Sequence, residues 1–335
     1  MSAASLAISA AIAVSGQSAP LTAREKAAWE RIKPSIVVLM RSGSPTGAAA
    51  MIDPSGLFIT HADSVQGNSM DARLLDGRTL RLQLKNSDGT TQLALLKIVG
   101  SVPEGLRPLG MPEGNERPGT PMFAIMPAGP VRAEFVSANQ LGRVGPGLRI
   151  LPLSEVRFER SGSSISGALL VSYDREFMGA LYATLATRES DQMGANLLAP
   201  GGLGPNLTVK SPLVRQMGPA QMTVAYTVGP DVVRRVVEDF RAPGHDVSYP
   251  ALGVFCRNAQ EGGALIQRIN PGSSAEKAGL RINDVILEIN GAPIDNQIDF
   301  SRVMFRQQVG AKISVRFRRG QSEIVRSVVV GRQAE

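Results

Sequence analysis

Short apolar segments separated by Gly, Pro, Asp and Asn fill the chain from Ser35 to about residue 240. They include residues 36–40, 47–52, 56–60, 93–98 and 122–125. Strands of this length, bounded by turn-forming residues, are typical of all-β barrels and sandwiches. The chain's 35 glycines and 22 prolines fit a fold with many turns. The pattern therefore predicts a mainly β fold over residues 35–240.

Four segments depart from the strand pattern. Residues 21–34 are amphipathic and predict a short N-terminal helix that ends at Pro34, and residues 232–240 predict another helix. Residues 186–220 are rich in Gly and Pro, which predicts a long surface loop. Residues 241–248 have the composition of a linker, so a second domain is expected over residues 249–333.

The C-terminal region carries the most specific pattern. Residues 265–269 predict a strand, residues 274–278 a one-turn helix that Gly279 ends, and residues 284–289 a further strand before the hairpin signal Asn290-Gly291. In this order the segment 263–291 closely resembles a PDZ domain of the bacterial protease type. The resemblance implies a small β-barrel with two helices.

A PDZ groove binds an extended peptide as an added strand, and consecutive backbone N–H groups bind the peptide carboxylate. The matching segment is Ala251-Leu252-Gly253-Val254. Gly253 allows the backbone to turn its amides to one point, and Leu252 and Val254 would line the side-chain pocket. The alternative is that this segment is only the first strand of a domain whose groove is unused.

The preceding region resembles the HtrA/Deg family of serine proteases, which place a trypsin-like double β-barrel ahead of one or two PDZ domains. The resemblance rests on residues 56–60, which match the strand before the family's histidine, and on residues 88–98, which match the strand that carries its aspartate. Residues 167–169 match the end of the nucleophile loop, and residues 223–230 match the wall of the specificity pocket. The expected fold is therefore a trypsin-like double β-barrel followed by a PDZ domain.

The three catalytic positions that this resemblance implies hold unsuitable residues. The family's histidine position is Asp63, its aspartate position is Gln92, and its nucleophile position is Ile165. A serine protease needs a nucleophilic oxygen, an imidazole that accepts its proton, and a carboxylate that orients the imidazole. Asp63 is a weak base, Gln92 carries no charge, and Ile165 has no nucleophilic atom. The triad is therefore expected to be degenerate.

An active arrangement built from neighbouring residues is the alternative. Ser164 would be the nucleophile, His61 the base and Asp88 the acid. His61 lies two residues before the expected position, which along a strand displaces a side chain by roughly 6–7 Å. Asp88 lies four residues before Gln92, at the expected start of its strand. Three independent adjustments would be needed for this arrangement to cleave a peptide bond.

Composition excludes several other classes of function. The net charge is +7 and the pI is about 9.9, but the Lys and Arg residues are scattered, so no nucleic-acid role is expected. The single cysteine, Cys256, cannot form an intrachain disulfide, and the two histidines, His61 and His245, cannot supply a histidine-rich metal site. No metal and no cofactor are expected.

The first 20 residues have an apolar run at Leu6–Val14 and the signal-like end Ser18-Ala19, but no Lys or Arg precedes Arg24. Residues 1–20 are therefore a weak export signal or a tail. The protein is expected to be periplasmic or secreted, with a cytoplasmic location left open. The apolar run is too short to cross a bilayer, and no integral membrane segment is expected.

The combined expectation is a non-catalytic member of the HtrA/Deg family that binds peptides. The partners are C-terminal or extended peptides and unfolded or partner proteins, and the role is that of a scaffold, a chaperone-like holder or a regulatory subunit. The family resemblance also implies a homotrimer formed through N-terminal segments, although the helix that carries Trp29 could equally pack on its own barrel. The alternative is an active serine-type endopeptidase that uses Ser164.

Overall fold

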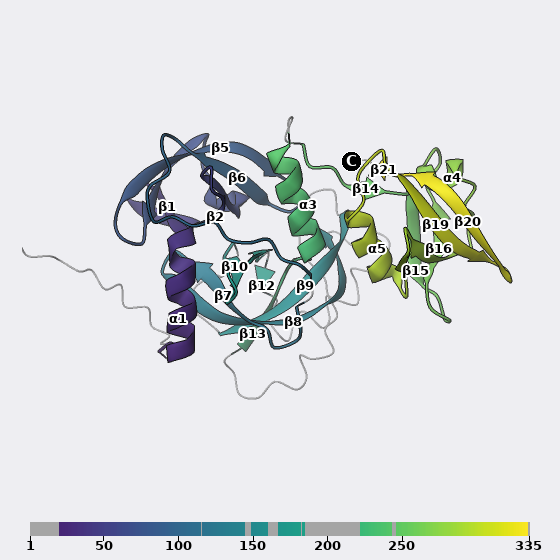
Figure 1. The fold of residues 1–335 in the computed structure, drawn as a ribbon, viewed down its shortest axis with the longest axis horizontal. Helices are drawn as coiled ribbons and strands as arrows, with labels where there is room; N and C mark the ends of the chain where they lie inside the picture. The colour runs from purple at the N-terminus through teal and green to yellow at the C-terminus, as the bar shows by residue number, and fades with distance from the viewer. Residues whose placement is uncertain are drawn as a thin grey trace, which may run out of the picture.

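The structure is a computed structural model that describes residues 20–114, 116–144, 149–159, 167–181, 183–184, 222–242 and 246–333. Two β-rich domains lie side by side, with helices α3 (Pro230–Arg241) and α5 (Gln297–Phe305) where they meet (Figure 1). The mainly β fold predicted from the sequence is confirmed. Two predicted segments lie outside the described residues: the N-terminal segment, of which only Pro20 is described, and the expected loop at residues 186–220.

The N-terminal helix α1 spans Ala23–Ile32. Thr22 begins it with a capping box, in which the Thr22 hydroxyl accepts a hydrogen bond from the amide of Glu25 and the Glu25 carboxylate accepts one from the amide of Thr22. Arg132 holds the helix on the second β-sheet, since its guanidinium donates to both carboxylate oxygens of Glu25 at 2.7 and 2.9 Å. Trp29 packs edge-on against Phe123 of that sheet, with ring centroids 6.1 Å apart. The Trp29 side chain therefore contributes to the core of its own chain.

The first β-unit is a closed barrel with the strand order β1-β2-β3-β6-β5-β4. Its strands are β1 (Ile36–Arg41), β2 (Ser44–Asp53), β3 (Leu57–His61), β4 (Ser69–Leu74), β5 (Thr79–Asp88) and β6 (Leu93–Ile98). The alternating burial of β4, in which every second side chain is buried, fits a strand with one face on the barrel core. Strand β3 ends at His61, where a short 3₁₀ helix at Ala62–Ser64 begins.

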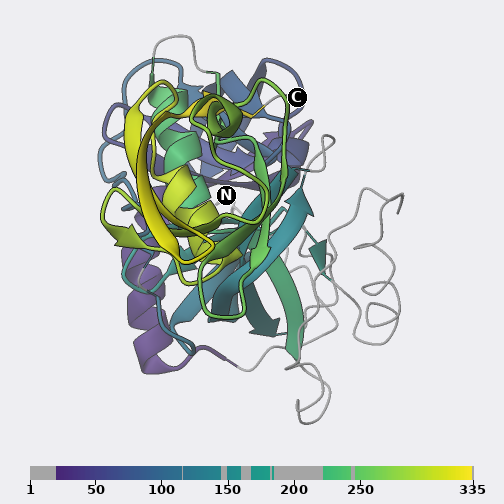
Figure 2. The ribbon, with the colours of Figure 1, turned by 90° about the vertical axis from the view of Figure 1, so that its right-hand side faces the viewer.

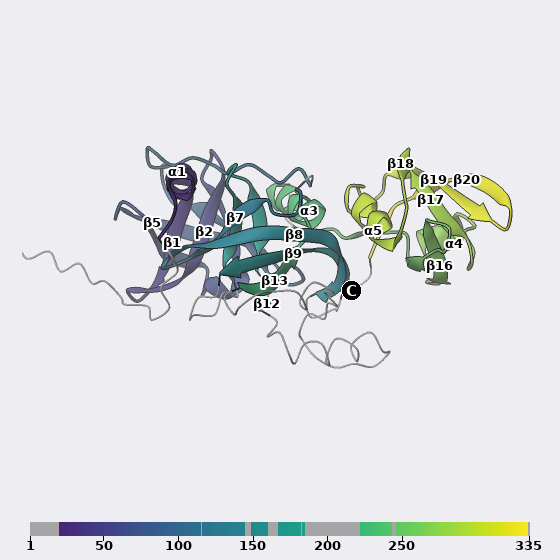
Figure 3. The ribbon, with the colours of Figure 1, turned by 90° about the horizontal axis from the view of Figure 1, so that it is seen from below.

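The second β-unit is a seven-stranded sheet with the order β11-β10-β7-β8-β9-β13-β12 over the described residues. Its strands are β7 (Pro121–Met126), β8 (Gly129–Val144), β9 (Arg149–Glu159), β10 (Leu169–Ser172), β11 (Phe177–Ala180), β12 (Ala183–Thr184) and β13 (Met222–Val228). The long hairpin β8–β9 reaches from this sheet towards the C-terminal domain (Figure 3).

The C-terminal domain has a six-stranded antiparallel sheet, a separate pair of short strands and two helices, and it lies in front of the rest of the chain in Figure 2. Its strands are β14 (Pro250–Ala251), β15 (Val254–Asn258), β16 (Ala264–Ile269), β17 (Val285–Ile289), β18 (Ala292–Pro293), β19 (Lys312–Arg319), β20 (Ser322–Val329) and β21 (Gly331–Arg332). Helix α4 (Ser274–Lys277) is the predicted one-turn helix, and α5 is capped by Asn296, whose side chain accepts from the amides of Ile298 and Asp299.

The two domains are joined by ion pairs between α3 and α5. Asp231, whose side chain is 1% exposed, lies in the first turn of α3 and accepts from Arg306 at 2.9 Å and from Arg302 at 3.3 Å. In the other direction, the buried guanidinium of Arg235 donates to the carbonyls of Phe305 and Gln307 at the C-terminal end of α5. A helix carries a partial positive charge at its N-terminal end and a partial negative charge at its C-terminal end. Asp231 and Arg235 therefore each lie at a helix end that attracts their charge.

Candidate functional site

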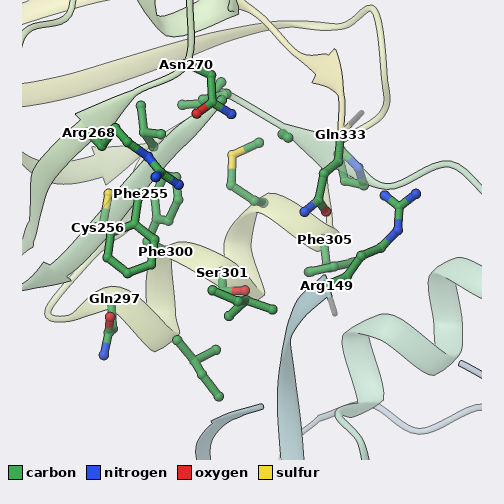
Figure 4. Close-up of a pocket in the computed structure, with 18 residues that line it drawn as sticks. Arg149, Phe255, Cys256, Arg268, Asn270, Gln297, Phe300, Ser301, Phe305 and Gln333 are labelled. Carbon is green, nitrogen blue, oxygen red and sulfur yellow. The ribbon is translucent and has the colours of Figure 1, made fainter. Parts of the chain in front are cut away.

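A cavity of about 480 Å³ lies between β15 and α5 and continues onto the β8–β9 hairpin (Figure 4). The four residues predicted to bind a peptide, Ala251, Leu252, Gly253 and Val254, all line it. The predicted segment therefore lines a cavity, and peptide binding there stays a prediction. The remaining lining residues from the C-terminal domain are Pro250, Phe255, Cys256, Arg268, Asn270, Gln297, Phe300, Ser301, Met304, Phe305 and Gln333.

The loop that enters this groove depends on glycine. Gly253 has φ +77°, and a Cβ placed on it would lie 2.4 Å from the Cβ of Ser273. The backbone carbonyls of Leu252 and Gly253 accept from the amides of Ala275 and Asn270, while the amides of Leu252 and Gly253 have no backbone partner among the described residues. Such amides can donate to a carboxylate.

Three residues from outside the C-terminal domain complete the cavity wall, namely Leu141, Arg149 and Ile150 of the β8–β9 hairpin. The sequence does not predict these three residues, because no local sequence pattern indicates which segment of one domain faces the groove of another. Arg268 was also missed. Its position could be inferred from strand pairing, since it is the register partner of Phe255 in the β15–β16 ladder.

His61 lies buried where β3 ends, and its side chain is only 1% exposed. Its Nε2 atom is 3.0 Å from Oε1 of Gln92, and its Nδ1 atom accepts from the amide of Asp63 at 3.3 Å. Burial lowers the pKa of His61 below its ordinary value, although the Asp63 carboxylate and the Gln92 hydrogen bond act in the opposite direction. The imidazole is therefore held in its neutral form near pH 7.

The chain around His61 differs in two ways from the sequence expectation. Residues 62–64 form a 3₁₀ turn, so the chain is not extended between His61 and Asp63. The side-chain displacement predicted for an extended strand therefore does not apply to His61. Residues 88–98 are not one strand either: Asp88 is the last residue of β5, residues 89–92 turn, and β6 begins at Leu93. Gln92 in that turn has φ +51°.

The two acidic side chains of this region lie in different surroundings. The Asp63 side chain is 82% exposed, with its carboxylate 3.7 Å from Nδ1 of His61. Asp88 is buried and accepts hydrogen bonds from the amide and hydroxyl of Thr91 and from the hydroxyl of Tyr249. His61 and Asp88 are both register partners of Leu93 on β6, one from β3 and one from β5. They therefore lie on opposite sides of β6, so their Cα atoms are roughly 10 Å apart.

The nucleophile position Ile165 and the alternative Ser164 lie outside the described residues, as does His245. The first described residue after that segment is Gly167, with φ +80°. A Cβ on Gly167 would lie 3.5 Å from both Cγ and Nδ1 of His61. The end of the predicted nucleophile loop therefore reaches the imidazole.

Known proteins with this arrangement match both parts of the chain. Residues 250–330 match the family model described as a PDZ domain. HhoA of Synechocystis is 28% identical over 82% of this chain and 67% of its own length, and the periplasmic pH-dependent serine endoprotease DegQ of Escherichia coli is 25% identical over 80% of this chain and 55% of its own length. The HtrA-type protease AlgW with a tripeptide has the same fold, with a TM-score of 0.61, 19% identity, and coverage of 92% of this chain and 97% of its own.

The chain is similar to HtrA-type serine proteases over most of its length. Its trypsin-like domain followed by a PDZ domain is the HtrA organisation, as the sequence predicted. The chain spans about two thirds of HhoA and little more than half of DegQ. Within the part of the chain that the structure describes, no helix is long and apolar enough to cross a membrane, and no cluster of metal-binding side chains is found.

Proposed function

We propose that this protein is a non-catalytic HtrA family member that binds peptides or partner proteins through its PDZ groove. The observation that carries the proposal is the hydrogen bonding of His61. A catalytic imidazole is oriented by a carboxylate, which also stabilises its charged form. Here the Nε2 atom of His61 lies 3.0 Å from the neutral side chain of Gln92, and its Nδ1 atom accepts from the amide of Asp63.

The tautomer of His61 follows from these two contacts. Because Nδ1 accepts a hydrogen bond from the amide of Asp63, it carries the lone pair of the neutral ring, and the ring hydrogen is on Nε2. Nε2 then donates to the carbonyl oxygen of Gln92, which can only accept. The imidazole is used as a structural link between the end of β3 and the turn before β6.

The other family positions support the same proposal. Gln92 is neutral, so it cannot stabilise an imidazolium as a buried aspartate does. Asp63, at the family's predicted histidine position, is exposed to solvent, and a carboxylate is a much weaker base than an imidazole. Ile165, at the nucleophile position, offers no oxygen to attack a carbonyl.

The catalytic part of the proposal is tested with a fluorophosphonate probe, which labels activated serines covalently. We expect no labelling of the full chain and no cleavage of unfolded casein, under conditions in which DegQ is labelled and cleaves it. Labelling that disappears in Ser164→Ala but persists in Ser163→Ala would overturn the proposal.

Peptide binding is supported by the cavity at residues 251–254 and by the unused backbone amides of Leu252 and Gly253. AlgW, which shares the fold, is described with a decapeptide and with a tripeptide. The test is fluorescence polarisation with labelled peptides that end in a hydrophobic residue. We expect a free C-terminal carboxylate to bind and the same peptide with an amidated C-terminus to bind at least tenfold more weakly. Equal binding of the two forms would show that the groove amides are not used.

A second candidate function, an active serine-type endopeptidase, is favoured by one contact. The Cβ position of Gly167 lies 3.5 Å from the His61 ring, so a serine in the preceding segment could approach the imidazole. In this alternative Ser164 attacks, His61 accepts the proton and Asp88 supplies the charge. Asp88 is engaged instead by Thr91 and Tyr249, on the far side of β6. Loss of fluorophosphonate labelling in His61→Asn as well as in Ser164→Ala would establish this alternative.

We also propose a periplasmic or secreted location, because DegQ and other relatives are named as periplasmic proteins. The homotrimer implied by the family resemblance stays a prediction. Cell fractionation checks the first proposal, and sedimentation of the purified chain checks the second.

A further inference from the structure

The peptide groove has an unbalanced set of charges. Among the described residues that line it, two are arginines, Arg149 and Arg268, and none is an aspartate or glutamate. The remaining lining residues are apolar or neutral. A ligand that fills this cavity therefore meets two positive charges without a compensating negative charge on the wall.

Arg268 contributes the first of these charges. It extends from β16 beside Phe255, and its guanidinium carbon lies 5.8 Å from the centroid of the Phe255 ring. Among the described residues it has no ion pair. The aromatic face supports the cation but leaves its N–H donors to other partners.

Arg149 contributes the second charge from the other domain. It is the first residue of β9, and its guanidinium carbon lies 4.6 Å from the centroid of the Tyr249 ring. Its Nη1 atom is buried and has no hydrogen-bond partner among the described residues. A buried cationic donor without an acceptor is unfavourable, and a carboxylate in the cavity would supply the acceptor.

Three other arginines of the PDZ domain, Arg316, Arg318 and Arg319, are ion-paired with carboxylates within it. The absence of such partners at the groove is therefore not a general property of arginines in this part of the chain. Arg257, which is exposed on β15 and does not line the cavity, provides a comparison for experiments.

The two guanidinium groups lie on opposite sides of the cavity (Figure 4). Arg149 is beside Tyr249, which leads into the loop at residues 251–254, and Arg268 is beside Phe255, farther along β15. A peptide added along β15 runs between them, and alternate side chains of a strand point to opposite sides. Two carboxylates on such a peptide can reach different arginines.

We propose that the groove selects acidic peptides, with a hydrophobic C-terminal residue and carboxylate side chains near it, and that Arg149 and Arg268 determine this preference. The hydrophobic residue enters the apolar part of the pocket formed by Leu252, Val254 and Met304. Arg149 makes the site composite, since it belongs to the trypsin-like domain. The inference rests on the proposed peptide binding and specifies its substrate class.

The test uses the full chain and three labelled peptides of equal length that share the same hydrophobic C-terminal residue. They carry Glu, Gln or Lys at the two preceding positions. We expect the Glu peptide to bind at least tenfold more tightly than the Gln peptide, and the Lys peptide to bind most weakly. The difference between Glu and Gln should shrink as salt is raised from 50 to 500 mM, because salt screens the attraction.

Variants assign the effect to the two arginines. Arg268→Gln and Arg149→Met, which keeps an apolar contact with Tyr249, should each reduce the Glu-over-Gln preference at least threefold. Arg257→Gln should leave the preference unchanged. Circular dichroism checks that each variant is folded.

The outcomes separate this inference from the proposed function. If the Glu and Gln peptides bind equally well, acidic selection is wrong and peptide binding stands. If the preference persists in the double variant Arg149→Met/Arg268→Gln, these arginines do not determine it. If no peptide binds at any salt concentration, the proposed peptide-binding function itself is wrong.

Discussion

The Nε2 atom of His61 lies 3.0 Å from the Oε1 atom of Gln92, the residue predicted to occupy the aspartate position of an HtrA protease. This contact joins the end of β3 to the turn before β6, and the amide of Ala62 strengthens the junction by donating to the carbonyl of Gln92 at 2.7 Å. The pair therefore holds together the two segments that carry the family's histidine and aspartate positions.

The first prediction concerns this contact. Gln92→Glu keeps the side-chain length but places a negative charge beside Nε2, so the pKa of His61 should rise from its lowered value. NMR titration of the ring protons measures it. Gln83→Glu, on the exposed side of β5, serves as the control and should not shift the titration. An unchanged pKa in Gln92→Glu would show that the two side chains do not meet.

The second prediction concerns pH and stability. Burial depresses the pKa of His61 in the folded state, so the unfolded chain binds that proton more readily. This effect costs the wild type no stability above the ordinary histidine pKa of about 6.5. Below that pH, its free energy of unfolding decreases as the pH falls. His61→Asn keeps an acceptor for the amide of Asp63 and removes the titration. Denaturant unfolding at pH 7.5 and 5 should therefore show a smaller loss for this variant than for the wild type, and an equal loss would contradict the assignment.

The third prediction concerns the junction between the domains. Asp231→Asn removes a buried charge that accepts from Arg302 and Arg306, and we expect it to destabilise the docked state by about 2 kcal/mol, the scale of a hydrogen bond to a charged group. Glu323→Gln removes a carboxylate from an exposed pair with Arg316, and should cost less than about 1 kcal/mol. Urea unfolding measures both variants. Equal effects would show that the α3–α5 ion pairs do not stabilise the interface.

The fourth prediction concerns the groove loop. Gly253→Ala places a methyl group in a left-handed conformation and against Ser273, whereas Gly272→Ala meets only the conformational strain. We expect Gly272→Ala to cost about 1–2 kcal/mol and Gly253→Ala to cost about 1–3 kcal/mol more. Only Gly253→Ala should weaken peptide binding, which fluorescence polarisation measures. Similar losses for both variants would show that Ser273 moves aside without cost.

The sequence predicted the parts of the fold that depend on local signals. The PDZ strands and the one-turn helix follow from short patterns around Pro271, Gly279 and Asn290-Gly291, and the groove segment follows from its place before β15. The match to HtrA relatives confirms the domain order. These signals are carried by neighbouring residues, so no knowledge of long-range packing is required.

The candidate site was less predictable because it depends on where strands end and on which segments meet. The predicted displacement of the His61 side chain from the family's histidine position depends on an extended strand as far as Asp63, but the chain turns at Ala62. Asp88 was expected at the start of the strand that carries Gln92, four residues away, whereas a turn separates them and Tyr249 binds the Asp88 carboxylate. Arg149 reaches the groove across a domain boundary, which no local pattern reveals.

The hydrogen bond from Tyr249 to Asp88, together with the bonds from Ser248 to Asp239, fixes the C-terminal end of the linker region onto the trypsin-like domain. The covalent connection is thus only one of several attachments between the domains. If a protease nicked the chain between Ala242 and Asp246, the two fragments would stay associated and elute together from a sizing column. They would separate only in high salt or denaturant.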